Sequence, residues 1–243
     1  MEPDILLYPL IALIAFLYAA VGHGGASGYL ALMALFGISS AVMRPSALLL
    51  NLFVSSIAYL QFYRGGHFRW KLFYPFALAS IPFAYFGANI SVDPLWYKRI
   101  LGVCLIFATL RILNVFGREQ QEKKTLSLPL AIFIGAALGL ISGIIGIGGG
   151  IILSPLILLL GWGSLKETAA VSALFIFVNS ASGLAGLLQT SHEFHPFVFS
   201  MAVAALLGGI AGSYAGSFKF NSAVMKMALA GVLFFASIKL IVI

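Results

Sequence analysis

The sequence has 243 residues, of which 61% are hydrophobic and only 9% are charged, and its formal net charge is +7. Soluble domains carry roughly 25% charged residues, so this composition excludes a soluble globular fold and indicates an all-α, polytopic integral membrane protein. The basic residues lie mainly between the apolar stretches, as they do when they orient a membrane protein. This distribution argues against a nucleic-acid-binding surface and makes the lipid bilayer the expected partner.

Apolar stretches close to the ~20 residues that a bilayer span requires recur along the chain. The first half is expected to contain spans at 5–21, 46–63, 72–90 and 100–116, with a shorter apolar piece at 29–36. The second half is expected to contain spans at 126–145, 168–188, 196–216 and 223–243, with a shorter piece at 151–160. We therefore divide the chain into a first membrane repeat (1–116), a polar cytoplasmic linker (117–127) and a second membrane repeat (128–243).

Glycines interrupt each half directly after its first span, at Gly22–Gly28 and at Gly146–Gly150. Glycine inside a helix costs about 1 kcal/mol relative to alanine, so three consecutive glycines predict a helix break. Within a membrane, a break is tolerated only where the freed backbone groups face protein or a water-filled cavity. Transporters use such places as binding sites. Close helix–helix packing, which also selects small residues, is the alternative.

The second half repeats the first at a shift of 124 positions, which places Gly22, Gly24 and Gly25 on Gly146, Gly148 and Gly149. The same shift aligns the pairs Phe53-Val54 and Phe177-Val178. The distribution of Lys and Arg favours five segments in each half. We therefore expect inverted repeats, each with a glycine-broken half-helix after its first segment. Four spans in each half, with parallel repeats, is the alternative.

The backbone amides that open the two half-helices, at Gly24–Ala26 and Gly148–Gly150, are expected to be unpaired donors at the positive end of a helix dipole. Such termini favour anions, and glycine lets a ligand approach the backbone closely. We expect the two termini to converge on one small anion near the membrane midplane. Two helices that simply pack across the symmetry axis are the alternative.

Polar side chains at helical spacing follow each glycine run and add candidate ligands. Asn51 and Ser55 share one helix face, and Ser55 is equivalent to Asn179 under the repeat. A buried Asn must be satisfied by another helix or by a ligand, and both options stay open. His23, the one ionisable side chain in either loop, is a candidate donor or a helix cap. The predicted substrate-binding residues are His23, Gly24, Gly25, Ser27, Asn51, Ser55, Gly148, Gly149, Gly150, Ser172, Asn179 and Ser180.

Three features of the sequence together resemble the TauE/SafE family of sulfite and organosulfonate exporters. They are Gly146–Gly150 with the trailing 151–161, the degenerate first copy at Gly22–Ala26, and the run from Arg44 to Asn51 that reads RPSALLLN. The resemblance covers the whole chain. It implies a small sulfur oxyanion or sulfonate as substrate, and transport across a bacterial cytoplasmic membrane. The first copy departs from the fuller glycine motif at His23 and Ala26.

The predicted spans contain no Asp or Glu well inside them, so neither a carboxylate proton relay nor a sodium site is apparent. Moving one charge across 100 mV is worth about 2.3 kcal/mol, and this gradient alone drives an anion out of a negative interior. We expect export by alternating access around the paired glycine loops. Proton-coupled anion uptake through His23 is the alternative. Neither a cofactor nor a bound metal is expected, and the oligomeric state stays open.

Two other functions are alternatives to transport, a serine protease and a membrane scaffold. The stretch from Gly25 to Gly28 contains the Gly-x-Ser-Gly that surrounds the nucleophile of rhomboid-type intramembrane serine proteases, which would make Ser27 the nucleophile. Such an enzyme needs a histidine within reach of that serine, and the repeat places Ile151 opposite Ser27. We therefore expect no enzymatic activity. A non-transporting membrane scaffold is the remaining alternative.

Overall fold

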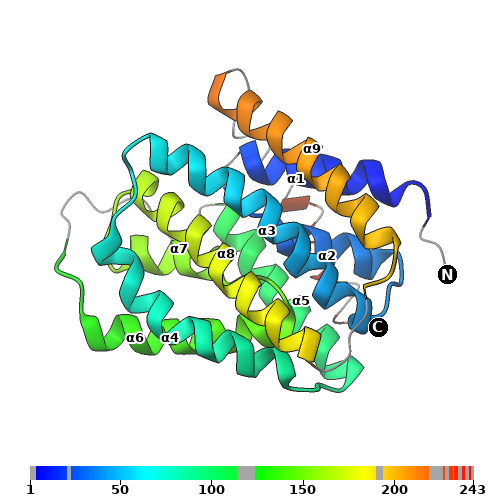
Figure 1. Cartoon of the computed structure of the whole chain (residues 1–243), viewed down its shortest axis with the longest axis horizontal. Helices are drawn as coiled ribbons and strands as arrows, with labels where there is room; N and C mark the ends of the chain where they lie inside the picture. The colour runs from blue at the N-terminus through cyan, green and yellow to red at the C-terminus, as the bar shows by residue number, and fades with distance from the viewer. Residues whose placement is uncertain are drawn as a thin grey trace.

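The computed structural model describes residues 4–20, 23–113, 124–189 and 194–218, together with residues 227, 230–231, 233–234, 237–238 and 241. This part of the chain folds into helices joined by loops and contains no strand, which confirms the all-α prediction (Figure 1). The helices are α1 (Leu7–Ala20), α2 (Ala26–Leu35), α3 (Ser40–Arg64), α4 (Trp70–Asn89), α5 (Pro94–Ile112), α6 (Leu128–Ile145), α7 (Gly150–Leu159), α8 (Leu165–Gln189) and α9 (Phe197–Phe218).

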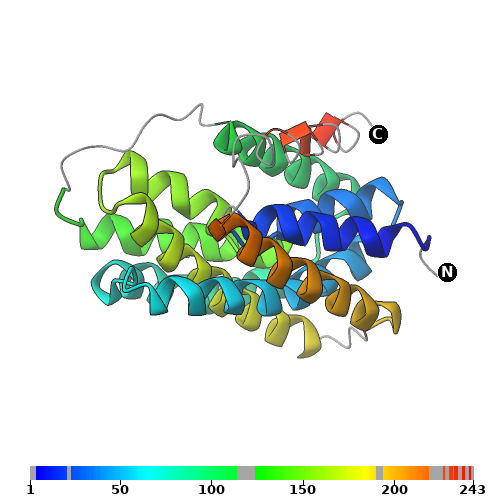
Figure 2. The ribbon, with the colours of Figure 1, turned by 90° about the horizontal axis from the view of Figure 1, so that it is seen from above.

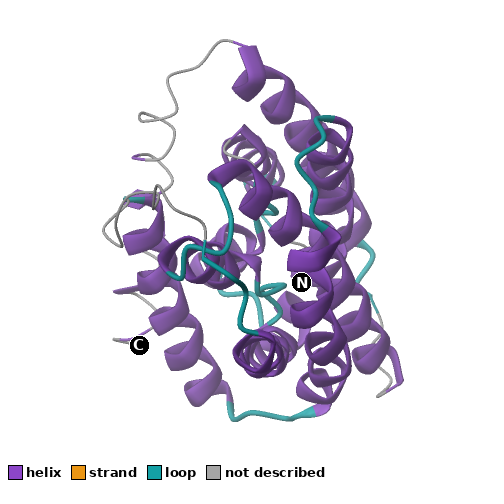
Figure 3. Cartoon of the chain, turned by 90° about the vertical axis from the view of Figure 1, so that its left-hand side faces the viewer, coloured by secondary structure: helices purple, strands orange, loops and turns teal. Residues whose placement is uncertain are grey.

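The longest helix contacts join the two halves of the chain. Helix α6 lies along α4, and α1 lies along α9, as Figures 1 and 2 show. In both contacts the first helix of one predicted repeat packs on the fourth helix of the other. Helices α3 and α8, the third of each predicted repeat, also pack against each other, and the short helices α2 and α7 contact α3 and α8, respectively. Seen from the side, the described residues are helices joined by loops (Figure 3). This packing of each predicted repeat on helices of the other agrees with a duplicated chain. The inverted orientation of the repeats stays a prediction.

Small residues let α4 and α6 approach closely. A Cβ atom built on Gly139 would lie 2.3 Å from the carbonyl oxygen of Ser80, and one on Gly143 would lie 2.2 Å from that of Ala84. Neither position can carry a side chain unless the helices separate. Gly139 and Gly143 therefore serve close helix packing, which is the alternative considered above. The glycines that follow them in the apolar run break the helix.

Large apolar side chains cover the outside of the bundle. Leu78 on α4, Phe133 on α6 and Leu207 on α9 are 70%, 71% and 63% exposed. Apolar surface on this scale is unfavourable in water and suits contact with lipid. In the described residues three helical segments are long and apolar enough to cross a membrane, namely Ser40–Arg64, Leu128–Ile145 and Lys166–Gln189.

Two helices begin earlier than the apolar pattern predicted. Helix α3 starts at Ser40 and continues through Pro45, and the hydroxyl of Ser46 donates to the carbonyl of Val42 beside this proline, at 2.6 Å. Pro45 has no N–H for the carbonyl of Ala41, so the helix continues past it with one backbone bond fewer. Helix α5 starts at Pro94, because Pro fits the first helical position and the preceding Asp is a favoured cap.

Three predicted features lie wholly or partly outside the described residues. Gly22 of the first glycine run is one of them. Most of the linker 117–127 and most of the last predicted span, 223–243, are the others.

Candidate functional site

The second glycine run breaks the helix, as the sequence predicts. Helix α6 ends at Ile145, and φ is 88° at Gly146, 72° at Gly148 and 74° at Gly149 before α7 begins. A residue with a side chain pays about 1–2 kcal/mol for this left-handed conformation. Within the described part of the chain, the amides of Gly148, Gly149 and Gly150 have no hydrogen-bond partner. These amides form the N-terminal end of a ten-residue helix, α7 (Gly150–Leu159).

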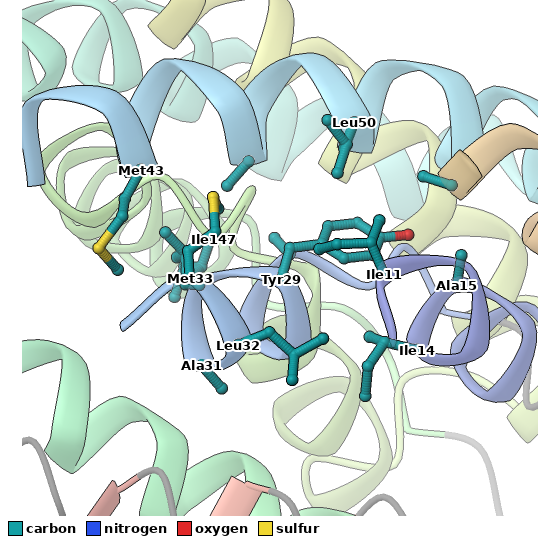
Figure 4. Close-up of a cluster of buried hydrophobic side chains, with 14 of the residues drawn as sticks. Ile11, Ile14, Ala15, Tyr29, Ala31, Leu32, Met33, Met43, Leu50 and Ile147 are labelled. Atoms are coloured by element: carbon teal, nitrogen blue, oxygen red, sulfur yellow. The ribbon is translucent and has the colours of Figure 1, made fainter. Parts of the chain in front are cut away.

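The first glycine run produces a second break of the same kind. Gly25 has φ of 101° and directly precedes α2, and the hydroxyl of Tyr29 lies 3.5 Å from the carbonyl oxygen of Gly24, to which it donates. The two loops meet in one core: Ile147, from the second break, belongs to the same buried cluster as Tyr29 and Met33 of α2 (Figure 4). The structure therefore brings the two breaks close together.

Asn51 lies between the two breaks. Its Nδ2 atom donates to the carbonyl of Ile147 at 3.4 Å and to the hydroxyl of Ser180 at 3.3 Å. A Cβ atom on Gly148 would lie 2.8 Å from this Nδ2, and one on Gly24 would lie 3.2 Å from Oδ1. Asn51 is fully buried, and its Oδ1 has no hydrogen-bond partner among the described residues. An unsatisfied buried acceptor costs about 1–3 kcal/mol. The position of the Asn51 amide therefore lowers the stability of the protein, and the surrounding contacts must offset this loss.

Ile176 fills the remaining space between the loops. Its side-chain carbons would lie within 3.2 Å of a Cβ on Gly24, and within 2.9 Å and 2.4 Å of a Cβ on Gly148 and on Gly150. It is only 4% exposed. No sequence pattern indicated this residue, because an isoleucine on an apolar helix is indistinguishable from other core residues. In this conformation the side chains of Ile176 and Asn51 occupy the space between the two glycine loops.

Two of the predicted polar residues make equivalent bonds in the two halves. Ser55 donates to the carbonyl of Asn51 at 2.6 Å, and Asn179 donates to the carbonyl of Phe175 at 2.8 Å. Both side chains are fully buried. The Oδ1 atom of Asn179 has no partner in the described part of the chain, so this amide keeps a free acceptor.

Ser172 is bound within its own half. Its hydroxyl accepts a hydrogen bond from Ser154 of α7 at 2.8 Å, and Ser154 lies 3.0 Å from the carbonyl of Gly150, to which it donates in the alternative orientation of its hydroxyl. This pair ties α8 to the helix that the second break opens. Ser172 is therefore connected to the second break by its hydrogen bond with Ser154.

Ser27 and His23 are engaged at the first break. The Ser27 hydroxyl lies 2.5 Å from the hydroxyl of Tyr18, and the backbone amide of His23 donates to the carbonyl of Tyr18 at 2.9 Å. The Ser27 hydroxyl thus pairs with a tyrosine, where a serine protease would need a histidine. The geometry favours a structural role for this hydroxyl.

Arg44 and Tyr97 are two further polar residues beside the second break. Arg44 donates to the carbonyls of Ala88 and Gly143 at 2.9 Å and 3.1 Å, and Tyr97 donates to the carbonyl of Ile145 at 2.9 Å. These carbonyls belong to the last turns of α4 and α6, where a cation also interacts favourably with the helix dipole. The two residues fix the end of α6 and with it the start of the glycine loop.

Comparison with known families decides what kind of protein carries this site. The family described as "Sulfite exporter TauE/SafE" matches residues 7–240. The chain belongs to the TauE/SafE family. The resemblance noted in the sequence is thereby confirmed over residues 7–240, a range that includes both glycine breaks.

Three relatives support the assignment to TauE/SafE. A protein of Sinorhizobium fredii named as a probable membrane transporter is 34% identical, over 94% of this chain and 94% of its own. Proteins with the same description from Methanocaldococcus jannaschii and Bacillus subtilis are each 26% identical, over 78% and 93% of this chain and 75% and 95% of theirs. No solved structure matches the chain. The TauE/SafE protein described here is therefore a member of a family of membrane transporters.

Proposed function

We propose that this protein exports a small sulfur oxyanion or organosulfonate across the bacterial cytoplasmic membrane, as a multi-pass protein that works by alternating access around its two glycine breaks. The observation that carries the proposal is the set of unpartnered amides at Gly148, Gly149 and Gly150, which open α7 beside the buried amide of Asn51. Helix N-termini of this kind favour anions. The family assignment supports the substrate class.

The buried polar residues support an anion that carries its own charge across the membrane. Those of the described chain are serines, threonines and asparagines, and none is acidic. Asn and Ser provide neutral hydrogen-bond donors, which satisfy an anion without holding a counter-charge that must also be moved. The membrane potential, at about 2.3 kcal/mol per charge and 100 mV, then supplies the driving force for export.

Access to the α7 amides requires a conformational change. Ile176 and Asn51 fill the space between the loops, and both side chains are buried. They belong to α8 and α3, the pair of long helices that packs across the two halves. Ile176 lies in the second half and Asn51 in the first, so movement of one half against the other separates these side chains and opens the space between the loops, as alternating access requires.

The direct test is efflux from proteoliposomes. Vesicles loaded with sulfite, with and without the purified protein, are compared under an inside-negative potential set by a potassium gradient and valinomycin. We expect the protein to accelerate sulfite release and the release to slow when the potential is collapsed. Sulfate, thiosulfate, a short alkyl sulfonate and acetate, each loaded in parallel, define the substrate class.

Two results would contradict the proposal. Equal release from vesicles with and without protein, for every anion of the panel, removes the transport function. If release does not depend on the potential but follows an imposed pH gradient, the potential-driven mechanism is wrong and transport is coupled to protons.

A further inference from the structure

The two glycine breaks differ in the polar residues at equivalent positions. The shift that superposes the glycine runs places Tyr18 of α1 on Ser142 of α6. It also places Ser27 on Ile151. The two half-helices therefore begin in different polar surroundings, although their backbones are interrupted in the same way.

At the first break, the protein itself supplies an oxygen to the helix N-terminus. The Tyr18 hydroxyl lies 2.5 Å from the hydroxyl of Ser27, which belongs to the first turn of α2. The Tyr18 ring would lie 2.7 Å from a Cβ on Gly28, so the phenol packs directly on the first turn of α2. Tyr18 and Ser27 are 1% and 4% exposed. An anion at this terminus would have to displace a buried phenol.

At the second break, the corresponding hydroxyl has no partner. Ser142 is 1% exposed, and its Oγ atom makes no hydrogen bond to any residue that the structure describes. Its Cβ atom lies 3.5 Å from the position that a Cβ on Gly149 would take. The hydroxyl is therefore a buried polar group beside the glycine whose amide is also unpartnered.

The missing bond of Ser142 is unusual within this protein. Ser46, Ser55 and Ser154 each donate to the carbonyl four residues earlier in their own helix, at 2.6, 2.6 and 3.0 Å. This local bond is the usual way for a helical serine to satisfy its hydroxyl. Ser142 lies in the same kind of helix without it. A hydroxyl left free in this way is available to a ligand.

We infer that the substrate anion binds at the N-terminus of α7 alone, with the Ser142 hydroxyl as a donor, and that the Tyr18 phenol occupies the equivalent place at α2. The inference rests on the proposed function and narrows its site from two helix termini to one. An oxygen of the anion takes the position at α7 that the Tyr18 oxygen takes at α2. The Nδ2 atom of Asn51 lies next to Gly148 but donates to Ile147 and Ser180, so it becomes a second donor to the anion when one of these two bonds opens.

Three variants test the inference with sulfite as the probe. Ser142→Ala removes the free hydroxyl, whereas Ser27→Ala and Tyr18→Phe remove hydroxyls at the first break. A hydrogen bond to a charged group contributes enough to change binding about tenfold or more. We expect Ser142→Ala to raise the half-saturating sulfite concentration of efflux by about tenfold, and the other two variants to stay within about twofold of the unmodified protein.

Thermal unfolding in detergent separates a binding role from a structural one. Without sulfite, Ser142→Ala should be as stable as the unmodified protein, because the lost hydroxyl has no hydrogen bond. Added sulfite should raise the unfolding temperature of the unmodified protein and of Ser27→Ala, and should raise that of Ser142→Ala much less. Calorimetric titration with sulfite should give one anion per chain.

The outcomes distinguish this inference from the function on which it rests. If the unmodified protein transports sulfite and Ser142→Ala has the same half-saturating concentration, the single site at α7 is wrong and the transport function stands. A loss of affinity in Ser27→Ala or Tyr18→Phe equal to that in Ser142→Ala, or two anions per chain, also overturns it. If the unmodified protein neither transports nor binds any anion of the panel, both proposals fail.

Discussion

Asn51 on α3 donates a hydrogen bond to the hydroxyl of Ser180 on α8 at 3.3 Å, although 129 positions separate the two residues in the chain. The same amide group donates to the carbonyl of Ile147 in the second glycine break. One side chain thus joins the two central helices to the loop that opens α7. The first prediction follows from this position.

Replacing Asn51 by Ala removes both hydrogen bonds and a donor next to Gly148. We expect sulfite efflux to fall at least tenfold, because a hydrogen bond to a charged group contributes about 1.5–3 kcal/mol. Asn89→Ala is the matched control, since Asn89 is exposed at the end of α4 and donates only to the carbonyl of Tyr85. Initial efflux rates at equal protein content are the measurement. Equal rates for the two variants would remove Asn51 from the site.

The glycines with left-handed backbone conformation are not all equally constrained. Gly148 and Gly37 have nearly the same φ, 72° and 73°, but a Cβ on Gly148 would lie 2.8 Å from Asn51 whereas one on Gly37 meets no atom within 4 Å. Both alanine variants therefore lose about 1–2 kcal/mol from the backbone. Gly148→Ala should lose about 1–3 kcal/mol more from overpacking, together with transport.

Unfolding temperatures of the two variants, measured by intrinsic fluorescence in the same detergent, compare these losses. Gly37→Ala should keep its efflux activity. Equal unfolding temperatures and equal activities would show that the loop has room for a side chain, contrary to the structure.

The contact between α4 and α6 is sensitive to a single methyl group. A Cβ on Gly139 would lie 2.3 Å from the carbonyl oxygen of Ser80, so Gly139→Ala forces the helices apart at a cost of about 1–3 kcal/mol. Gly183→Ala is the control, because its nearest neighbour would be a side-chain carbon of Leu48 at an ordinary 3.4 Å. We expect a lower unfolding temperature for Gly139→Ala than for Gly183→Ala. The reverse order would contradict this packing.

Arg44 holds two helix ends through one guanidinium group. It donates to the carbonyls of Ala88 and Gly143, on different helices. Lysine carries the same charge but lacks the planar fork of donors, so Arg44→Lys should lose about 1.5–3 kcal/mol of stability. The control is Arg64→Lys at the exposed C-terminal end of α3. Chemical unfolding midpoints that agree between the two variants would assign Arg44 no role at these helix ends.

Much of the architecture could be predicted because it depends on local properties. The apolar stretches predicted helices, and the consecutive glycines from Gly148 to Gly150 predicted the break before α7. Two predicted boundaries were wrong, because α3 and α5 extend beyond their apolar parts to Ser40 and Pro94. At α5 the preceding Asp93 caps the helix by accepting a hydrogen bond from the amide of Leu95 at 2.9 Å. The start of α8 shows the same effect: the amide of Ser164 donates to the Glu167 carboxylate at 2.8 Å, an arrangement typical of helix N-termini.

The site itself could be predicted only in part. Asn51 and Ser180 were identified from the type of side chain and the repeat, and the structure places them in contact. Ile176 carried no signal, because its role depends on the loops that close around it. Ser142 was missed for a similar reason, since a serine in an apolar helix is expected to bond to its own backbone.

By itself, the sequence determined that this protein is a helical membrane protein with glycine interruptions before two short helices, and it predicted that the two halves are repeats. Composition, hydrophobic length and glycine placement act over short segments, and they operate before the chain packs. Only the tertiary structure decided that α1 pairs with α9 and α6 with α4, that Asn51 reaches both loops, and that Tyr18 and Ser142 leave the two breaks unequal. These relations depend on which buried surfaces and hydrogen-bonding groups meet across more than a hundred residues, and no local pattern contains that information.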